Sequence, residues 1–275
     1  MRILGLIVLF ILCACTPKGS GLITSAEREG VLYDGDSRQE VTTSDRTYIV
    51  GQATAMIFDG NKKSFPSLGE MYPLCQDERF QDQKLIGFCS GVLIAPNKVL
   101  TAAHCMQEST RCQSSHFVFG AFNGVQNLAI YSCKNVAQLD RKLDYAIVEL
   151  DREVARVTPV KAASSFDLND QDFVLSMSYP LGLPLKQDIG KVLDSSPDSS
   201  FFKVAVDTFS GSSGSPLFDK KGQLVGILSR GEDDILEDDI YRVQTQGGCV
   251  NFNSCANGQC RGETFLKTSH ISNKL

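Results

Sequence analysis

The chain has 275 residues, of which 42% are hydrophobic and 21% are charged. This is the composition of an ordinary globular protein with room for two modest cores. A formal charge of −5 and the lack of any basic block argue against nucleic acid as a partner.

Residues 1–14 predict a secretory signal. Arg2 supplies a positive start, and Ile3–Leu12 is almost unbroken aliphatic sequence, too short to span a bilayer as a mature helix. The sequence LCAC at 12–15 resembles a bacterial lipobox, in which cleavage before the last cysteine is coupled to lipid attachment. We therefore expect a lipid on Cys15 and, by resemblance to Gram-negative lipoproteins, an outer-membrane location. Cleavage without lipidation, giving a periplasmic or extracellular protein, is the alternative.

Residues 15–47 are polar and turn-rich, and predict a tether followed by an N-terminal arm at the surface. From residue 48 onward, short hydrophobic runs alternate with turn residues, which is typical of an antiparallel all-β protein. Residues 48–155 and 156–275 are each expected to form a six-stranded barrel, with a site between them. The expected strands are 48–58, 88–94, 98–101, 117–122, 128–131 and 146–150, then 172–176, 190–194, 201–206, 216–218, 223–228 and 241–245.

Eight cysteines remain once the leader and Cys15 are set aside, and an exported chain meets an oxidising environment, so four disulfides are expected. We expect Cys112 to pair with Cys133, because the strands between them would form a closed hairpin. The partners of the other cysteines stay open at this point, and a zinc site in the last cluster is the weaker reading because export disfavours thiolates. The eight are Cys75, Cys89, Cys105, Cys112, Cys133, Cys249, Cys255 and Cys260.

Only three histidines, at 104, 116 and 270, are candidates for a general base. His104 lies near the end of residues 90–105, SGVLIAPNKVLTAAHC, in which two hydrophobic runs are joined by a turn. His116 and His270 lack such a context and are expected to be surface or packing residues.

Asp144 opens residues 144–150, DYAIVEL, in which alternate aliphatic residues would face a barrel interior. A carboxylate at this point would orient an imidazole and stabilise its cationic form. Asp140 and Asp151 are its neighbours in the sequence and compete for this role.

The stretch Asp207–Pro216 reads DTFSGSSGSP and lies between two expected strands. Gly211 and Gly214 allow tight backbone dihedral angles, so that N–H groups converge and a serine hydroxyl stands clear of the surface. Such a nest can stabilise an oxyanion. A Ser/Gly-rich hairpin loop without chemistry is the alternative.

The motifs around His104, Asp144 and Ser213, in that order, resemble those of chymotrypsin-fold (trypsin-like) serine proteases. The ending GSP and the arm residues 33–38 resemble the bacterial glutamyl-endopeptidase-like branch. The resemblance implies two Greek-key β-barrels with the active site in the cleft between them. It also implies a catalytic triad, with Ser213 as nucleophile, His104 as base and Asp144 as the orienting carboxylate, since Asp140 and Asp151 lack the matching spacing.

Further roles follow from the same resemblance. The N–H groups of Gly211 and Ser213 would form the oxyanion hole. Cys89 and Cys105 would form a disulfide beside the histidine. The strand Leu228, Ser229, Arg230 and Gly231 would pair with an extended substrate.

Two signals conflict over specificity for P1, the substrate residue on the amino side of the cleaved bond. Asp207, followed by Thr208, occupies the position where trypsin-like relatives bind Arg or Lys, whereas glutamyl-specific relatives use a histidine that Leu228 and Ser229 do not supply. Arg230 would either attract an acidic side chain or neutralise Asp207. Because a buried, unpaired Asp207 would be costly, we expect a basic P1 residue.

Ser212 stands where trypsin-like relatives place the Asp that pairs with a newly freed N-terminus, so activation of the trypsinogen type is expected to be absent. The acidic residues between 232 and 239 are interpreted as a solvated loop, with calcium binding as the minor alternative.

The sequence therefore predicts a serine endopeptidase that acts on protein or peptide substrates through an acyl-enzyme. We expect no cofactor and no metal, and a membrane contact only through the N-terminal lipid. The alternative is a catalytically inactive, membrane-tethered binding protein that keeps the protease fold.

Overall fold

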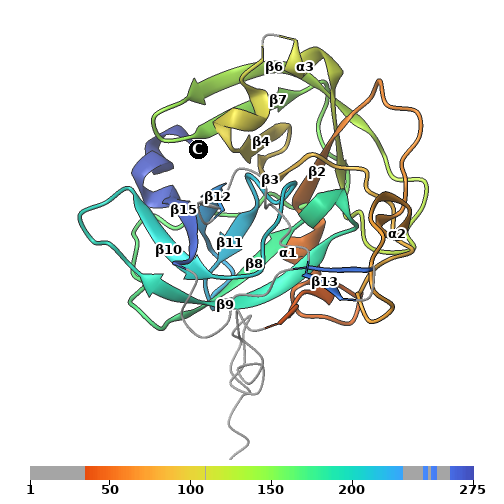
Figure 1. The fold of residues 1–275 in the computed structure, drawn as a ribbon. Helices are drawn as coiled ribbons and strands as arrows, with labels where there is room; N and C mark the ends of the chain where they lie inside the picture. Colours follow the sequence, from red (N-terminus) through yellow and green to blue (C-terminus); the bar gives the residue numbers. More distant parts are fainter. Residues whose placement is uncertain (1–34, 109, 232–243, 247–248, 253–260) are drawn as a thin grey trace, which may run out of the picture.

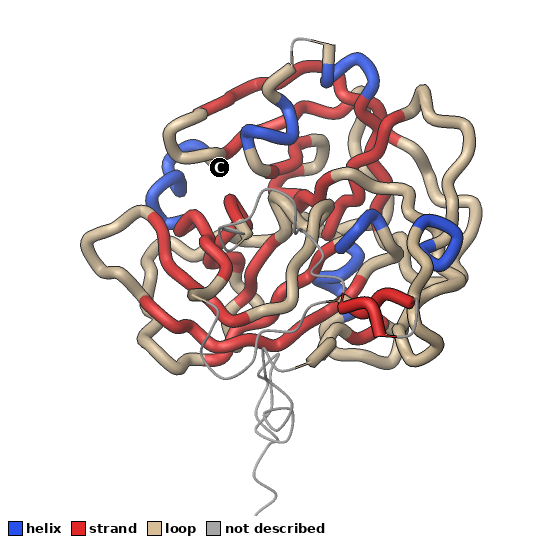
Figure 2. Tube along the Cα trace, viewed as in Figure 1, coloured by secondary structure: helices blue, strands red, loops and turns tan. Residues whose placement is uncertain are grey.

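The computed structural model describes residues 35–108, 110–231, 244–246, 249–252 and 261–275 (Figure 1). Strands dominate these residues, and the helices are short (Figure 2). The strands form two closed six-stranded antiparallel barrels, as the sequence predicts. The predicted signal segment, Cys15 and the acidic loop lie outside the described residues.

The first barrel closes in the strand order β2-β3-β4-β7-β6-β5. Its interior is filled by buried side chains such as Leu93, Val99, Phe117 and Val148. Because side chains alternate along a strand, each strand presents every second residue to this core. The strands are β2 (Thr54–Asp59), β3 (Cys89–Ala95), β4 (Lys98–Thr101), β5 (Ser115–Phe119), β6 (Tyr131–Asp140) and β7 (Tyr145–Leu150).

The second barrel follows the order β9-β10-β15-β12-β11-β8 and is closed by pairing between β8 and β9. Phe202, Leu217 and Phe265 lie in its core. A short strand, β1 (Gln39–Glu40), adds to the outer side of β9. The barrel strands are β8 (Phe173–Ser178), β9 (Lys186–Asp194), β10 (Phe201–Ala205), β11 (Pro216–Phe218), β12 (Leu224–Arg230) and β15 (Glu263–Lys267).

A third core joins the two barrels. Met56 and Leu100 from the first barrel and Leu175 from the second belong to one buried cluster. Tyr179, just after β8, is fully buried there and donates its hydroxyl to Thr54 O at 3.0 Å. Burial of this continuous apolar surface fixes the barrels against each other.

The remaining elements are short. None of the described helices is long and apolar enough to cross a membrane. The helices are α1 (Tyr48–Gln52), α2 (Leu68–Met71), η2 (Ala103–Met106), α3 (Arg111–Ser114), η3 (Pro180–Gly182) and η4 (Thr268–Lys274), and a separate two-stranded sheet pairs β13 (Gln244–Gln246) with β14 (Cys249–Asn251).

Three disulfides join described cysteines. Cys89 pairs with Cys105, and Cys112 pairs with Cys133. The third joins Cys75 to Cys249 across 174 positions of the sequence. Cys255 and Cys260 lie outside the described residues.

The sequence reading is wrong at both ends of the strand series. Residues 48–52 form the helical turn α1 instead of a strand: the Gly51 N–H donates to Thr47 O and the Ala53 N–H to Val50 O. The last barrel strand is β15, not the predicted residues 241–245. Glu263 and Lys267 at the two ends of β15 hide the apolar pattern of a buried strand.

Several other strands have shifted bounds, most of all β6 and β9, and the arm differs in burial. β6 runs over 131–140 instead of 128–131, and its exposed polar residues carry no hydrophobic alternation. β9 begins at Lys186, four residues earlier than predicted. The arm is not a simple surface segment either, because Arg38 is 1% exposed and Val41 is 4% exposed.

Gly190 tests the packing of β9 against β10 in the second barrel. A Cβ at this position would collide with the Ala205 carbonyl of the adjacent strand β10. We expect Gly190→Ala to lower the free energy of unfolding by about 3 kcal/mol, because neither backbone can move without breaking the ladder. Gly69→Ala is the control, since a Cβ there would make only ordinary contacts. Equal denaturant midpoints for the two variants would contradict this packing.

Candidate active site

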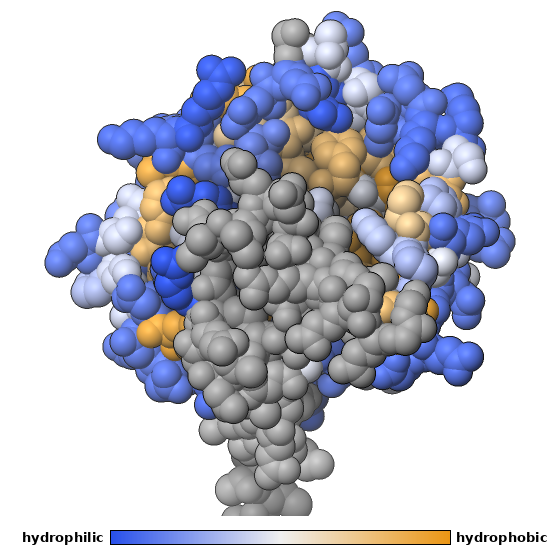
Figure 3. Space-filling view, viewed as in Figure 1, coloured by the Kyte–Doolittle hydropathy of each residue, from blue (hydrophilic) through white to orange (hydrophobic). Residues whose placement is uncertain are grey.

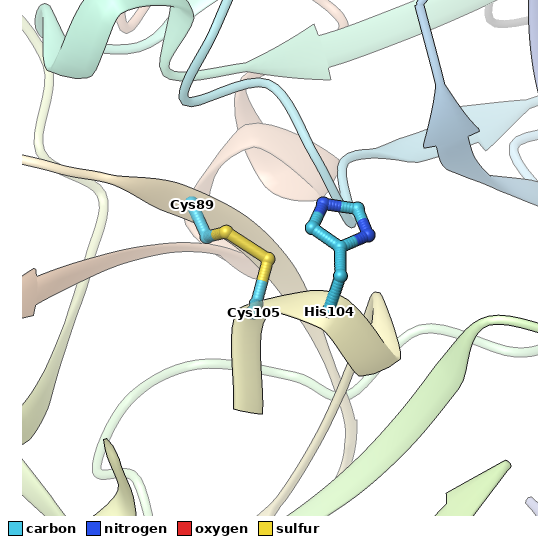
Figure 4. A group of neighbouring side chains, drawn as sticks. All are labelled: Cys89, His104 and Cys105. Carbon is cyan, nitrogen blue, oxygen red and sulfur yellow. A yellow bond between two sulfur atoms is a disulfide. The ribbon is translucent and has the colours of Figure 1, made fainter. Parts of the chain in front are cut away.

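His104 lies in η2, directly after β4, and its side chain is 39% exposed. The adjacent Cys105 is bonded to Cys89 on β3, so the histidine turn is tied to the neighbouring strand. Figure 4 shows the disulfide beside the imidazole. Ligand atoms of these three residues lie within 4.8 Å of one another, but both sulfurs are used in the disulfide. This group therefore offers no thiolate to a metal.

Asp144 holds the imidazole from one side. It takes a left-handed backbone conformation, φ 53°, at the turn before β7. Its carboxylate accepts the His104 N–H at 3.0 Å and lies 3.0 Å from His104 Nδ1. Ser229 Oγ on β12 donates to the same carboxylate at 2.7 Å. Both barrels thus contribute to the orientation of this His–Asp pair.

The charge on Asp144 is stabilised in this position. Burial raises the pKa of Asp144, but hydrogen bonds from His104 and Ser229 and the imidazole charge outweigh it, so the pKa lies below its ordinary value. Asp144 is therefore ionised at neutral pH, and a carboxylate next to Nδ1 favours the tautomer whose Nε2 can accept a proton.

Ser213 lies on the loop between β10 and β11, which we call the nucleophile loop and define as residues 207–213. Gly211 takes φ +93°, a backbone conformation that a side chain would strain. Ser90 on β3 binds this loop twice: its N–H donates to Ser213 O at 2.8 Å, and its hydroxyl donates to Gly211 O at 2.8 Å. The first barrel therefore fixes the loop beside the histidine turn, where Cys105 Sγ lies 3.8 Å from Ser213 O.

Backbone N–H groups at the tip of the loop divide into two sets. Those of Ser212, Gly214 and Ser215 donate to carbonyl oxygens of the protein. Within the described part of the chain, those of Gly211 and Ser213 have no backbone acceptor. These two N–H groups are the pair that the sequence assigns to an oxyanion hole.

The competing residues have other roles. Asp140 accepts the N–H groups of Lys142 and Leu143, which shapes the turn before Asp144. Asp151 accepts the Ser132 N–H. Neither has a hydrogen bond with His104 among the described residues.

The remaining serines and histidines are placed as follows. Ser212 and Ser215 are buried, and Ser212 Oγ accepts the Phe209 N–H. His116 lies on β5 against Phe58, and His270 is paired with Ser200.

Asp207 has partners that the sequence does not predict. Its Oδ2 accepts the N–H of Ser37 at 2.7 Å and the hydroxyl of Ser37 at 2.9 Å. Its own N–H donates to Asp188 Oδ2 at 2.7 Å. Burial, together with the Asp188 charge, raises the pKa of Asp207 to about 7, and burial also raises the pKa of Asp188. Two carboxylates with raised pKa values thus lie together beneath the nucleophile loop.

Of the two alternatives for Arg230, neutralisation of Asp207 finds no support among the described contacts. Arg230 is exposed and lies over the Phe201 ring, 5.8 Å from its centroid. The residue next to Asp207, Thr208, instead donates its hydroxyl to Glu263 Oε2 on β15.

Among the other predicted substrate-binding residues, Leu228 and Ser229 are buried, and Gly231 is exposed next to Glu263. A carboxylate therefore lies between the nucleophile loop and the end of β12. Sequence reasoning missed Glu263 because it expected the last strand elsewhere.

Because the pKa of Asp207 is raised, we expect this buried carboxylate pair to make the free energy of unfolding fall as the pH rises. An unfolded Asp has a pKa of about 3.9, so between that value and about 7 the folded state holds a proton that the unfolded chain releases. Stability from this group is complete below about pH 4 and is lost as the pH rises through 7. An Asn at position 207 does not titrate, so Asp207→Asn should not lose this stability. We expect the free energy of unfolding of the variant, relative to that of the wild type, to rise by about 1–3 kcal/mol between pH 4 and pH 8.

Denaturant unfolding at a series of pH values measures this difference. Asp82→Asn, at an exposed position, is the matched control and should follow the wild type. Parallel pH profiles for wild type and Asp207→Asn would contradict the pairing of the two carboxylates.

A family model described as a trypsin-like peptidase domain matches residues 89–227, just over half of the chain. The matched segment begins at Cys89 on β3 and ends at Ile227 on β12, so it contains His104, Asp144 and Ser213. No curated protein matches the chain.

Proposed function

Because the chain belongs to the family of trypsin-like peptidases, we propose that it is a serine endopeptidase that cleaves protein or peptide substrates through an acyl-enzyme. The observation that carries the proposal is the His104–Asp144 pair, 3.0 Å apart, in the barrel against which the Ser213 loop is bonded. In this mechanism His104 takes the proton of Ser213 as its hydroxyl attacks the peptide carbonyl.

Electrostatic stabilisation would come from the loop itself. The N–H groups of Gly211 and Ser213 would receive the oxyanion of the tetrahedral intermediate, and Asp144, held by Ser229, would stabilise the imidazolium. His104 then returns the proton to the leaving amine, and water hydrolyses the acyl-enzyme by the same route in reverse. These steps need no cofactor.

Ser213 provides the direct test. We expect wild-type protein to hydrolyse a protein substrate and to be labelled by a fluorophosphonate probe, and Ser213→Ala to lose both, with kcat reduced about 10⁴-fold or more. Ser210→Ala, at an exposed position on the same loop, is the control and should keep its labelling. If the folded wild type neither turns over substrate nor becomes labelled, the chain is a binding protein with a protease fold.

We also propose that P1 is a basic residue. Support comes from Glu263, a buried carboxylate that accepts the Thr208 hydroxyl at the base of the nucleophile loop, one residue after Asp207. A guanidinium or ammonium group entering there would neutralise buried negative charge. Neither the ending GSP nor the arm supplies a histidine for glutamyl specificity, so likeness to that branch is proposed for the framework only.

A library of fluorogenic peptides that vary only at P1 measures this preference. We expect Arg and Lys to exceed Glu and Ala in kcat/KM by about 10²-fold, since a charged group left without its partner in a buried site costs several kcal/mol. Replacing Thr208 by Val, which removes the hydroxyl bonded to Glu263, should change this ratio. Preference for Glu or for small residues would overturn the proposal.

We also propose that the protein is exported from the cytoplasm. The three disulfides agree with an oxidising compartment outside the cytoplasm. Attachment through a lipid on Cys15 is proposed from the leader sequence alone.

A further inference from the structure

The arm residues 36–41 lie against the second barrel behind the nucleophile loop. Gln39 and Glu40 form β1, which pairs in antiparallel register with Gln187 and Lys186 of β9. Val41 then enters the core that joins the two barrels. In Figure 1 this part of the chain is red and runs next to β9. The arm is thus built into the fold through β9 and through the core between the barrels.

Ser37 binds both carboxylates beneath the loop. Its hydroxyl lies 2.7 Å from Asp188 Oδ1 and 2.9 Å from Asp207 Oδ2, and its N–H donates to Asp207 Oδ2 at 2.7 Å. A buried carboxylate is costly unless hydrogen bonds compensate for the lost water. Asp207 is the first residue of the nucleophile loop, so the donors of Ser37 fix the point where that loop begins.

Arg38 supports the middle of the same loop. It is 1% exposed, and its Cζ lies 4.3 Å from the centroid of the Phe209 ring, four residues before Ser213. Nε and Nη2 donate to the two carboxylate oxygens of Asp36 at 2.7 and 2.8 Å. This bidentate bond fixes the plane of the guanidinium, and a planar cation stacks on an aromatic face.

Burial of the Arg38 guanidinium costs free energy, which indicates that this side chain has a role beyond filling space. Its Nη1 is buried and has no hydrogen-bond partner among the described residues. Such a group costs about 1–3 kcal/mol, and a leucine or methionine would fill the space without that cost. The guanidinium charge, in return, acts on Asp188 and Asp207 and favours their ionised forms. The charge of Arg38 therefore acts on Asp207 and its stacking acts on Phe209, at the two ends of residues 207–209.

We propose that Ser37 and Arg38 are positioning residues that hold the nucleophile loop in the conformation in which the Gly211 and Ser213 N–H groups face the oxyanion. The contacts with Asp207 and Phe209 fix residues 207–209, and Ser90 fixes residues 211–213 from the other barrel. The loop is thereby held at both ends by segments far from it in sequence. This inference rests on the proposed function, because it assigns the arm a part in that reaction.

The test separates positioning from folding by comparing two inhibitors. A peptide boronic acid forms a tetrahedral adduct with Ser213 and needs the oxyanion N–H groups, whereas the same peptide as an amide needs only the substrate-binding strand. We expect Ser37→Ala and Arg38→Met, made in the full chain, to bind the boronic acid at least tenfold more weakly, with kcat lowered by a similar factor. The inhibition constant of the amide and KM should stay within about threefold.

Matched controls lie on the same arm. Ser44→Ala and Arg46→Met replace exposed residues of the same types and should behave as wild type. Ser37→Thr keeps the hydroxyl and the N–H and should recover most of the kcat that Ser37→Ala loses. If Arg38→Met does not fold, Ser37→Ala and Ser37→Thr still decide the question.

The contrary results are distinct. Wild-type kcat and boronic acid affinity in a folded Ser37→Ala variant overturn the positioning role. If both inhibitors lose affinity equally, and the fraction of molecules that a fluorophosphonate labels falls by the same factor, the two residues have a role in folding alone. That result also overturns the positioning role. A wild type without Ser213-dependent labelling instead ends the proposed function itself.

Discussion

Close contact between the nucleophile loop and the first barrel is the constraint on which the rest of the structure depends. Gly214, the residue directly after this loop, has φ +81° and packs so tightly that a Cβ would lie 2.5 Å from Ser90 O and 2.7 Å from Ala102 N. Ser90 in turn holds Gly211 O, and its hydroxyl accepts the Tyr179 N–H. Because Gly214 has no side chain, the second barrel can pack this closely against Ser90 and Ala102 of the first barrel.

The pKa values of Asp144 and Asp207 are shifted in opposite directions. Asp144 is kept ionised by donors from His104 and Ser229, which suits a group that must face a cation. Asp207 and Asp188 are buried together and hold protons more tightly than usual, with Ser37 as their shared donor. The same residue type thus serves as a fixed charge near the imidazole and as a protonatable support beneath the loop.

Local sequence motifs made the family and the barrel fold predictable. Ordered motifs around His104, Asp144 and Ser213 indicated the family and the barrel class, since each motif is local and sits at the edge of a hydrophobic strand. The contacts of Asp207 were not predictable, because Ser37 and Asp188 approach it from 170 and 19 positions away. Polar residues in buried strands, such as Glu263, likewise hide the pattern on which strand prediction depends.

The disulfide between Cys75 and Cys249 spans most of the region that contains both barrels. A peptide bond cut anywhere between these two cysteines leaves fragments that stay covalently joined until a reductant is added. Among the residues coloured in Figure 3, hydrophilic ones predominate around the rim of this face, and exposed loops are where proteolytic cuts concentrate. A molecule cut once between the two cysteines would therefore migrate as an intact chain on a non-reducing gel, and the cut would become visible only after reduction.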